Sequence, residues 1–279
     1  MNAPRFRQAG APLAVAAGVV ALHLGAIRTG FLNDDYLFLE EAQRRTLFDA
    51  IAHPQALANY FRPLSRQVWF ALLAPAANPL LFHLGQLAAF LLAAWLLLDL
   101  LGELAPPAAA LAGVAWFVAL PLQRVNLTWI SCAQDLFALA GTLGALALYR
   151  RGRDVPAAVV WLAALLSKES SLPLPALLYF WSRRVDGAPP RAAWARLRPF
   201  APAFALWLAG ETWLRHASPG PAQLHFGPVY FAAAYVHMLQ SLVGLDHPAG
   251  LAQALALARP SAAAFALLAA AALWLPAAG

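Results

Sequence analysis

Long stretches without a single Asp, Glu, Lys or Arg are the feature that most constrains this chain. One of them runs from Gln8 to Ile27 and another from Gln67 to Leu98. About 20 consecutive apolar residues span the hydrocarbon core of a bilayer, so stretches of this length predict transmembrane helices. The composition agrees, because 62% of the 279 residues are hydrophobic and 11% are charged, against about 25% charged residues in soluble domains. We therefore expect an integral membrane protein and exclude a soluble globular domain, a disordered chain and a disulfide scaffold.

The apolar stretches and the prolines between them predict an all-α fold with about nine transmembrane helices in one domain, residues 1–279. Pro75, Asn78 and Pro79 divide the second long stretch into a short interfacial or re-entrant segment and a full helix. The expected helices are Gln8–Ile27, Pro79–Leu101, Pro106–Leu122, Ala133–Tyr149, two halves of Val155–Ser182, Phe200–Leu214, Val229–Leu245 and Pro260–Pro276.

Lys168 and Glu169 interrupt the apolar stretch from Val155 to Ser182. A single tilted helix would leave both charges in hydrocarbon, which is costly. Two short helices joined by a turn at 167–173 place them in a recessed turn covered by protein. This arrangement also puts the basic clusters that flank the stretch on one side, as the positive-inside rule favours. We therefore predict two helices here.

The arginines predict which side of the membrane each loop faces. Lys168 is the one lysine among 19 cations, and the chain is rich in Ala, which indicates a GC-rich bacterial genome. We expect the helical spans to lie in the bacterial inner membrane. With the basic N-terminus cytoplasmic, a first loop at 32–66 with short amphipathic helices and further loops at 123–134, 167–171 and 216–228 are periplasmic. Topology then explains the net charge of +6, and we expect the lipid bilayer, and no nucleic acid, as a partner.

The periplasmic loops collect the polar residues that are candidates for chemistry. Charges at membrane depth persist mainly where they pair or line a functional cavity. Paired carboxylates beside cations suit a reaction in which a base activates a hydroxyl while a phosphate leaves. The candidates are Asp34, Asp35, Tyr36, Arg62, Arg124, Asp135, Lys168 and Glu169.

Several of these residues also have a purely structural interpretation. Asp34 and Asp35 could mark a solvated helix boundary, and Lys168 and Glu169 could simply neutralise each other. His83, one turn inside its helix, could be a hydrogen-bonded packing residue. The later histidines lack metal-ligand spacing, so no metal ligands are predicted.

Short motifs in a fixed order carry a resemblance to a known family. They are Asp34-Asp35 after the first helix, Phe61-Arg62-Pro63-Leu64, Pro79 to His83, Trp129-Ile130-Ser131 with Asp135, and Leu166-Ser167-Lys168-Glu169-Ser170. Together, over about residues 5–184, they resemble the GT-C membrane glycosyltransferases. The nearest branch is protein O-mannosyltransferase-like, with its dolichyl-phosphate-mannose-protein mannosyltransferase-like bacterial relatives. Family members often have Asn and a second His where this chain has Gln86 and Phe90, and most are longer, so we expect a C-terminally shortened member.

The resemblance implies an enzyme that transfers a sugar from a polyprenyl-phosphate carrier to a protein, lipid or envelope-glycan acceptor at the periplasmic face. Asp34 or Asp35 would be the catalytic base on the acceptor hydroxyl. No nucleotide cofactor is implied, and because the family includes metal-dependent and metal-independent members, a divalent metal stays open. The implied phosphate-binding residues are Arg62, Lys168 and Arg124, and the implied substrate-orienting residues are Glu169, Asp135, His83 and Tyr36.

Two other classes of function fit the same composition. A transporter or flippase could use Asp34, Lys168 and Glu169 as a proton or substrate relay. Such a protein is expected to have broken helices in two related halves, and the sequence has no such internal symmetry. The third class is a noncatalytic subunit of an envelope-glycan assembly complex.

Overall fold

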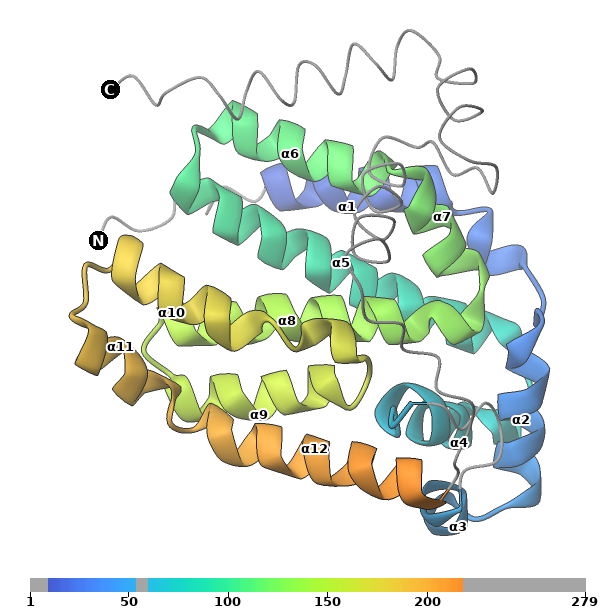
Figure 1. Ribbon diagram of the computed structural model, residues 1–279. Helices are drawn as coiled ribbons and strands as arrows, with labels where there is room; N and C mark the ends of the chain where they lie inside the picture. Colours follow the sequence, from blue (N-terminus) through green and yellow to red (C-terminus); the bar gives the residue numbers. More distant parts are fainter. Residues whose placement is uncertain (1–9, 54–59, 218–279) are drawn as a thin grey trace, which may run out of the picture. The chain divides into compact units, whose positions relative to one another are not determined.

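Helices are the regular secondary structure of residues 10–53 and 60–217, the part of the chain that the computed structural model describes (Figure 1). The α-helices are α1 (Gly10–His23), α2 (Asp34–Arg44), α3 (Leu47–Ala52), α4 (Trp69–Leu73), α5 (Pro79–Leu104), α6 (Pro107–Ala119), α7 (Pro121–Thr128), α8 (Ala133–Arg150), α9 (Asp154–Leu165), α10 (Leu174–Arg184), α11 (Pro190–Leu197) and α12 (Phe200–Ala217). Single-turn 3-10 or π segments are η1 (Ala26–Arg28), η2 (Leu64–Val68), η3 (Ala74–Ala76), η4 (Ile130–Cys132) and η5 (Glu169–Ser171). The helices expected at 229–245 and 260–276 lie outside the described residues.

Two described helices are long and apolar enough to cross a membrane, α5 and the helical stretch Ile130–Arg150. A third is obtained if α6 and the helical stretch Leu122–Thr128 are counted as one bent span, and α1 and α9 contain shorter apolar stretches. The all-α prediction is thus confirmed for the described residues. Nine spans were expected for the whole chain, and the described residues contain two or three helices that could cross a membrane.

The helix α6 ends earlier than the sequence suggested. A single helix was expected from Pro106 to Leu122, whereas α6 stops at Ala119 and the chain bends by 56° before Leu122–Thr128. The proline at position 121 has no backbone N–H to extend the hydrogen-bond ladder, and it disfavours helical geometry at the preceding residue. The bend therefore follows from local backbone chemistry.

The helices α8 and α9 form the closest helix pair near the candidate site, and small residues make their approach possible. A Cβ atom added to Gly141 would lie 2.8 Å from the Cβ of Ala164, so only glycine fits at this crossing. The hairpin turns at Gly152, which has a φ of +73°, a value that glycine adopts without strain. On either side, α5 packs against α8 and α12 packs against α9 (Figure 1).

The turn predicted inside the stretch 155–182 is present. α9 ends at Leu165 and α10 begins at Leu174, so Lys168 and Glu169 lie in the connection rather than inside a helix. The indole N–H of Trp161 donates to the carbonyl of Ser171 at 2.8 Å and ties this connection back to α9. The two-helix prediction is confirmed.

Charged side chains on α5 and α8 gather at the helix ends. At one end of α8, Arg150 pairs with Asp99 at 3.8 Å and also with Glu103, both on α5. At the other end, Asp135 lies in the first turn of α8. The rise along a helix separates Asp135 from Arg150 by roughly 22 Å, and the side chains between them are uncharged. This distribution is typical of a helix that crosses a bilayer core of about 30 Å.

Candidate functional site

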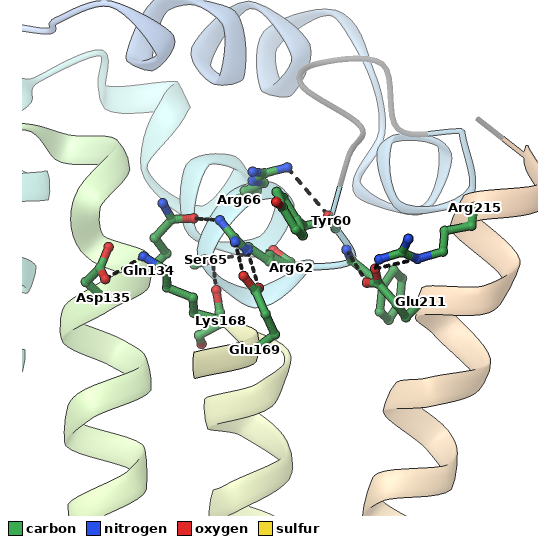
Figure 2. A network of polar contacts seen from close by, with 12 residues as sticks. Tyr60, Arg62, Ser65, Arg66, Gln134, Asp135, Lys168, Glu169, Glu211 and Arg215 are labelled. Atoms are coloured by element: carbon green, nitrogen blue, oxygen red, sulfur yellow. Dashed lines mark hydrogen bonds and ion pairs between the residues drawn. The ribbon is translucent and has the colours of Figure 1, made fainter. Parts of the chain in front are cut away.

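Polar residues from four parts of the chain meet at the N-terminal end of α8 (Figure 2). They come from the segment 60–66, from the first turn of α8, from the connection after α9, and from α12. Because these parts lie up to 150 positions apart, only the tertiary structure brings them together. We call this group of residues the polar cluster; its main members are Tyr60, Arg62, Ser65, Arg66, Gln134, Asp135, Lys168, Glu169 and Glu211.

Arg62 lies at the centre of the polar cluster, with 7% of its surface exposed. Its Nε donates to one carboxylate oxygen of Glu169 at 2.8 Å, and its Nη2 donates to the other oxygen. Its Nη1 donates to Oε1 of Gln134 at 2.7 Å, and the ring of Tyr60 lies 4.3 Å from the guanidinium carbon. Such a bidentate pair is strong and fixes the orientation of both groups. Of the five N–H donors of Arg62, these bonds leave two, one on each Nη, on a guanidinium whose charge Glu169 already balances.

The backbone around Arg62 is fastened to the connection after α9. The hydroxyl of Ser65 donates to the carbonyl of Ser167 at 2.7 Å, and the N–H of Leu64 donates to the carbonyl of Leu166 at 3.1 Å. The turn η2 is π-helical, a geometry found frequently at functional sites. These bonds hold Arg62 and Glu169 in register.

Lys168 pairs with Asp135 rather than with its neighbour Glu169. The Nζ of Lys168 lies 2.5 Å from Oδ1 of Asp135, and the two side chains are 23% and 34% exposed. The backbone of Lys168 is extended, with φ −162° and ψ 137°, and successive side chains of an extended backbone point in opposite directions. This explains why two adjacent charges join separate pairs. An ammonium has three N–H donors, and Asp135 is its one acceptor among the described residues, so Lys168 retains donors for a ligand.

Glu169 stays ionised in this setting. Burial by itself would raise its pKa, but the hydrogen bonds and the positive charge of Arg62, together with the charge of Lys168, lower the pKa of Glu169 below its usual value. Glu169 therefore meets Arg62 as a carboxylate rather than as a neutral carboxyl group.

The two adjacent acids of the first loop have different environments. Asp35 is fully buried, and it accepts hydrogen bonds from the N–H of Leu32 at 2.8 Å and from the N–H and hydroxyl of Ser131 at 2.7 and 2.5 Å. Burial raises the pKa of Asp35 despite these bonds. Asp34 is half-buried in the first turn of α2 and accepts no hydrogen bond from another described residue. Asp34 is thus the accessible carboxylate, and Asp35 holds the loop to η4.

Arg66 and Glu211 belong to the cluster although they were not predicted. Arg66 is 8% exposed and lies over the ring of Phe38, 5.3 Å from its centroid. Burial, and next the like charge of Arg62, lower the pKa of Arg66 to about 10, while the negative charges of Glu169 and then Asp34 act in the opposite direction. Glu211 is the lone acid of α12, and an acid in an otherwise apolar part of a helix is the signal that could have found it.

The remaining predicted residues lie outside the hydrogen-bonded cluster. His83 is buried, and its ring nitrogens each lie 2.9 Å from a backbone carbonyl, that of Leu127 and that of Thr29. This contact pattern is that of a packing residue. Tyr36 is 59% exposed. Arg124 lies exposed on α7, and its side chain forms no hydrogen bond or ion pair with another described residue.

An open apolar groove of about 600 Å³ leads away from the cluster between α5, α8 and α9. Leu64 and Ser167 line the end next to the cluster, and Arg151 lines the groove as well. Most of the other lining residues are apolar and many are small; they include Ala89, Leu96, Ala140, Gly141, Gly144 and Ala163. An elongated apolar molecule with a charged head would match this distribution.

Comparison with known proteins gives no match, whether with family models, with curated proteins or with solved structures. Among the described residues, no group of three or more His, Cys, Asp or Glu side chains is arranged to hold a metal ion. Function must therefore be argued from the geometry of this chain.

Proposed function

We propose that this chain is a membrane glycosyltransferase of the GT-C type, which transfers a sugar from a polyprenyl-phosphate carrier to an acceptor. The proposal includes about nine transmembrane helices, a bacterial inner membrane location and an active face on the periplasmic side. The observation that carries it is the junction between the polar cluster and the apolar groove. Ser167 lines the groove, and the next residue, Lys168, has donors to offer.

A polyprenyl phosphate has the shape and polarity that this junction requires. Its isoprenoid tail would lie in the groove between α5, α8 and α9, where burial of apolar surface is favourable. Its phosphate would bind at Lys168, which Asp135 holds in place. Cations in a low-dielectric site stabilise the negative charge that develops on a leaving phosphate.

The accessible acid then has a defined role in the transfer step. The carboxylate of Asp34 takes the proton from the acceptor hydroxyl while that oxygen bonds to the anomeric carbon of the sugar. The bond between this carbon and the phosphate oxygen breaks, and its electron pair leaves with the polyprenyl phosphate. Arg62, held by Glu169 and Gln134, adds positive potential behind the phosphate.

The full chain, purified in lipid nanodiscs, provides the test. Binding of polyprenyl phosphate would be measured first, with inorganic phosphate and an uncharged polyprenol as probes for the head and the tail. Transfer would then be followed with radiolabelled polyprenyl-phosphate mannose and a membrane extract as acceptor source. We expect Lys168→Met to weaken binding of the carrier and Asp34→Asn to lower transfer by about 10²–10⁴-fold while binding persists.

Arg44→Met is the matched control, because Arg44 is an exposed cation that pairs only with Glu40 among the described residues, on the same helix as Asp34. This variant should bind and transfer as the unmodified chain does. Equal affinity for the carrier in Lys168→Met and in the control would refute the phosphate site. Carrier movement across the bilayer without a new glycosidic bond would replace the proposal with a flippase.

A further inference from the structure

The helix α12 reaches the polar cluster through one buried acid. Glu211 is 8% exposed, and its Oε2 accepts a hydrogen bond from the backbone N–H of Phe61 at 2.9 Å (Figure 2). Its Oε1 accepts from Nε and Nη2 of Arg215, one turn further along α12, at 3.0 and 2.8 Å. Both carboxylate oxygens are therefore engaged, one with the segment before Arg62 and one with its own helix.

The same segment rests on α12 through its side chain. A Cβ atom added to Gly210 would lie 2.2 Å from Cε1 of Phe61, so the ring occupies space that any other residue at this position would fill. The ring of Trp213 meets the ring of Phe61 edge to face, with centroids 6.3 Å apart. We call Gly210, Glu211 and Trp213 the Phe61 seat.

The Phe61 seat acts on the residue that follows Phe61 in the chain. Arg62 is bound on one side by Gln134 and Glu169, and these contacts fix its guanidinium. They do not involve the backbone before Arg62, where Nη1 of Arg66 lies 3.5 Å from the carbonyl oxygen of Tyr60. The Phe61 seat adds a shorter hydrogen bond to this backbone, at 2.9 Å, from a helix 150 positions away in the sequence. An ion pair with Arg215 alone would need no contact with Phe61, because that pair is complete within α12.

We propose that Glu211 and Gly210 are positioning residues, which hold the Phe61-Arg62 segment so that Arg62 faces the carrier phosphate. The positioning of the Phe61-Arg62 segment is inferred from the contacts alone. The effect on phosphate binding rests on the proposed function. Displacement of α12 would thus change the phosphate site without any direct contact between α12 and the carrier.

Hydrogen–deuterium exchange at the Phe61 amide measures the positioning directly. Glu211→Leu removes the acceptor, and loss of one hydrogen bond to a charged group lowers protection by about 10- to 100-fold. Glu211→Gln keeps an acceptor oxygen and should retain most of that protection. Thr212→Ala is the matched control, because its hydroxyl bonds only within α12, to the carbonyl of Ala209 at 3.0 Å, among the described contacts. The control should leave exchange unchanged.

The glycine provides a second variant that leaves Glu211 intact. Gly210→Ala should displace the ring and raise exchange at residue 61, and adding Phe61→Ala should relieve the clash and restore the protection. Affinity for polyprenyl phosphate should follow the same order as the protection, with weaker binding in Glu211→Leu and in Gly210→Ala.

The two levels of the proposal fail in different ways. If the unmodified chain does not bind polyprenyl phosphate, the proposed function is wrong, while the exchange data still decide whether the Phe61 seat exists. If the unmodified chain binds the carrier and Glu211→Leu exposes the Phe61 amide without weakening binding, the positioning role is refuted. Unchanged protection in both Glu211→Leu and Gly210→Ala would refute the Phe61 seat itself.

Discussion

The pairing of charges in the polar cluster can be measured by double-mutant cycles. The structure joins Lys168 to Asp135 and Arg62 to Glu169. A cycle combines two single variants with their double variant and isolates the coupling energy of the pair. Suitable substitutions are Lys168→Met, Asp135→Asn, Arg62→Met and Glu169→Gln, because each removes a charge and keeps approximate size. The free energy of unfolding would be measured in detergent micelles.

The expected coupling energies follow from burial and geometry. Exposed ion pairs contribute about 0.2–1 kcal/mol, whereas removing one partner of a buried pair costs about 3–5 kcal/mol. Arg62 is 7% and Glu169 is 35% exposed, and the pair is bidentate, so we expect a coupling of about 2–3 kcal/mol between these limits. Lys168 and Asp135 are 23% and 34% exposed with one contact, for which about 1–2 kcal/mol is expected.

The cycle between Lys168 and Glu169 is the internal control. These residues are neighbours in sequence and interact only through space, so their coupling should stay below about 0.5 kcal/mol, the scale of an exposed pair. A coupling between Lys168 and Glu169 that equals or exceeds that between Lys168 and Asp135 would refute the pairing. It would restore the interpretation in which Lys168 and Glu169 neutralise each other.

Further predictions concern the acids, the groove and the topology. Asp34→Asn should lower turnover by about 10²–10⁴-fold, the usual loss for a missing general base, and full transfer activity in this variant would contradict the assignment. Asp35→Asn should instead lower the melting temperature. The carboxylate of Asp35 accepts hydrogen bonds from two backbone N–H groups, and the NH2 group of an amide would have to face one of these donors. The pKa of Glu169 is below its ordinary value of 4.5. Its contribution to the free energy of unfolding should therefore be present above pH 4.5 and be lost as the pH falls toward the pKa of the folded state. A Glu169→Gln variant that unfolds in acid with the same profile as the unmodified chain would contradict this expectation. Gly144→Leu should fill the groove and weaken carrier binding, whereas Gly144→Ala, whose Cβ would make only ordinary contacts at 3.5 and 3.9 Å, should not; equal binding by both variants would exclude the groove as the tail site. A reporter fused after Arg184 should be cytoplasmic, and a periplasmic signal would overturn the proposed topology.

Sequence alone was sufficient for the features that depend on local chemistry. The apolar stretches predicted helices because about 20 apolar residues match the bilayer core, and those at Pro79–Leu104, Ala133–Arg150 and Phe200–Ala217 are present. The turn around Lys168 was predictable, since a charged pair in hydrocarbon is costly. The bend after α6 also has a local signal, the proline at 121, but apolar composition does not reveal it because the stretch remains apolar through the bend.

Which charges pair, and which acid is accessible, was decided only by the tertiary structure. Asp34 and Asp35 are equivalent in sequence. Yet Ser131, 96 positions away from Asp35, donates hydrogen bonds to Asp35 and not to Asp34. Glu211 and Phe61 are 150 positions apart, and no periodicity of the chain links them. Periodicity and composition report how a residue relates to solvent or lipid, whereas partner choice depends on which helices pack together. That packing follows from the shapes of side chains such as Gly141 and Ala164, whose close approach sets the spacing of α8 and α9 and with it the distance between Asp135 and Lys168.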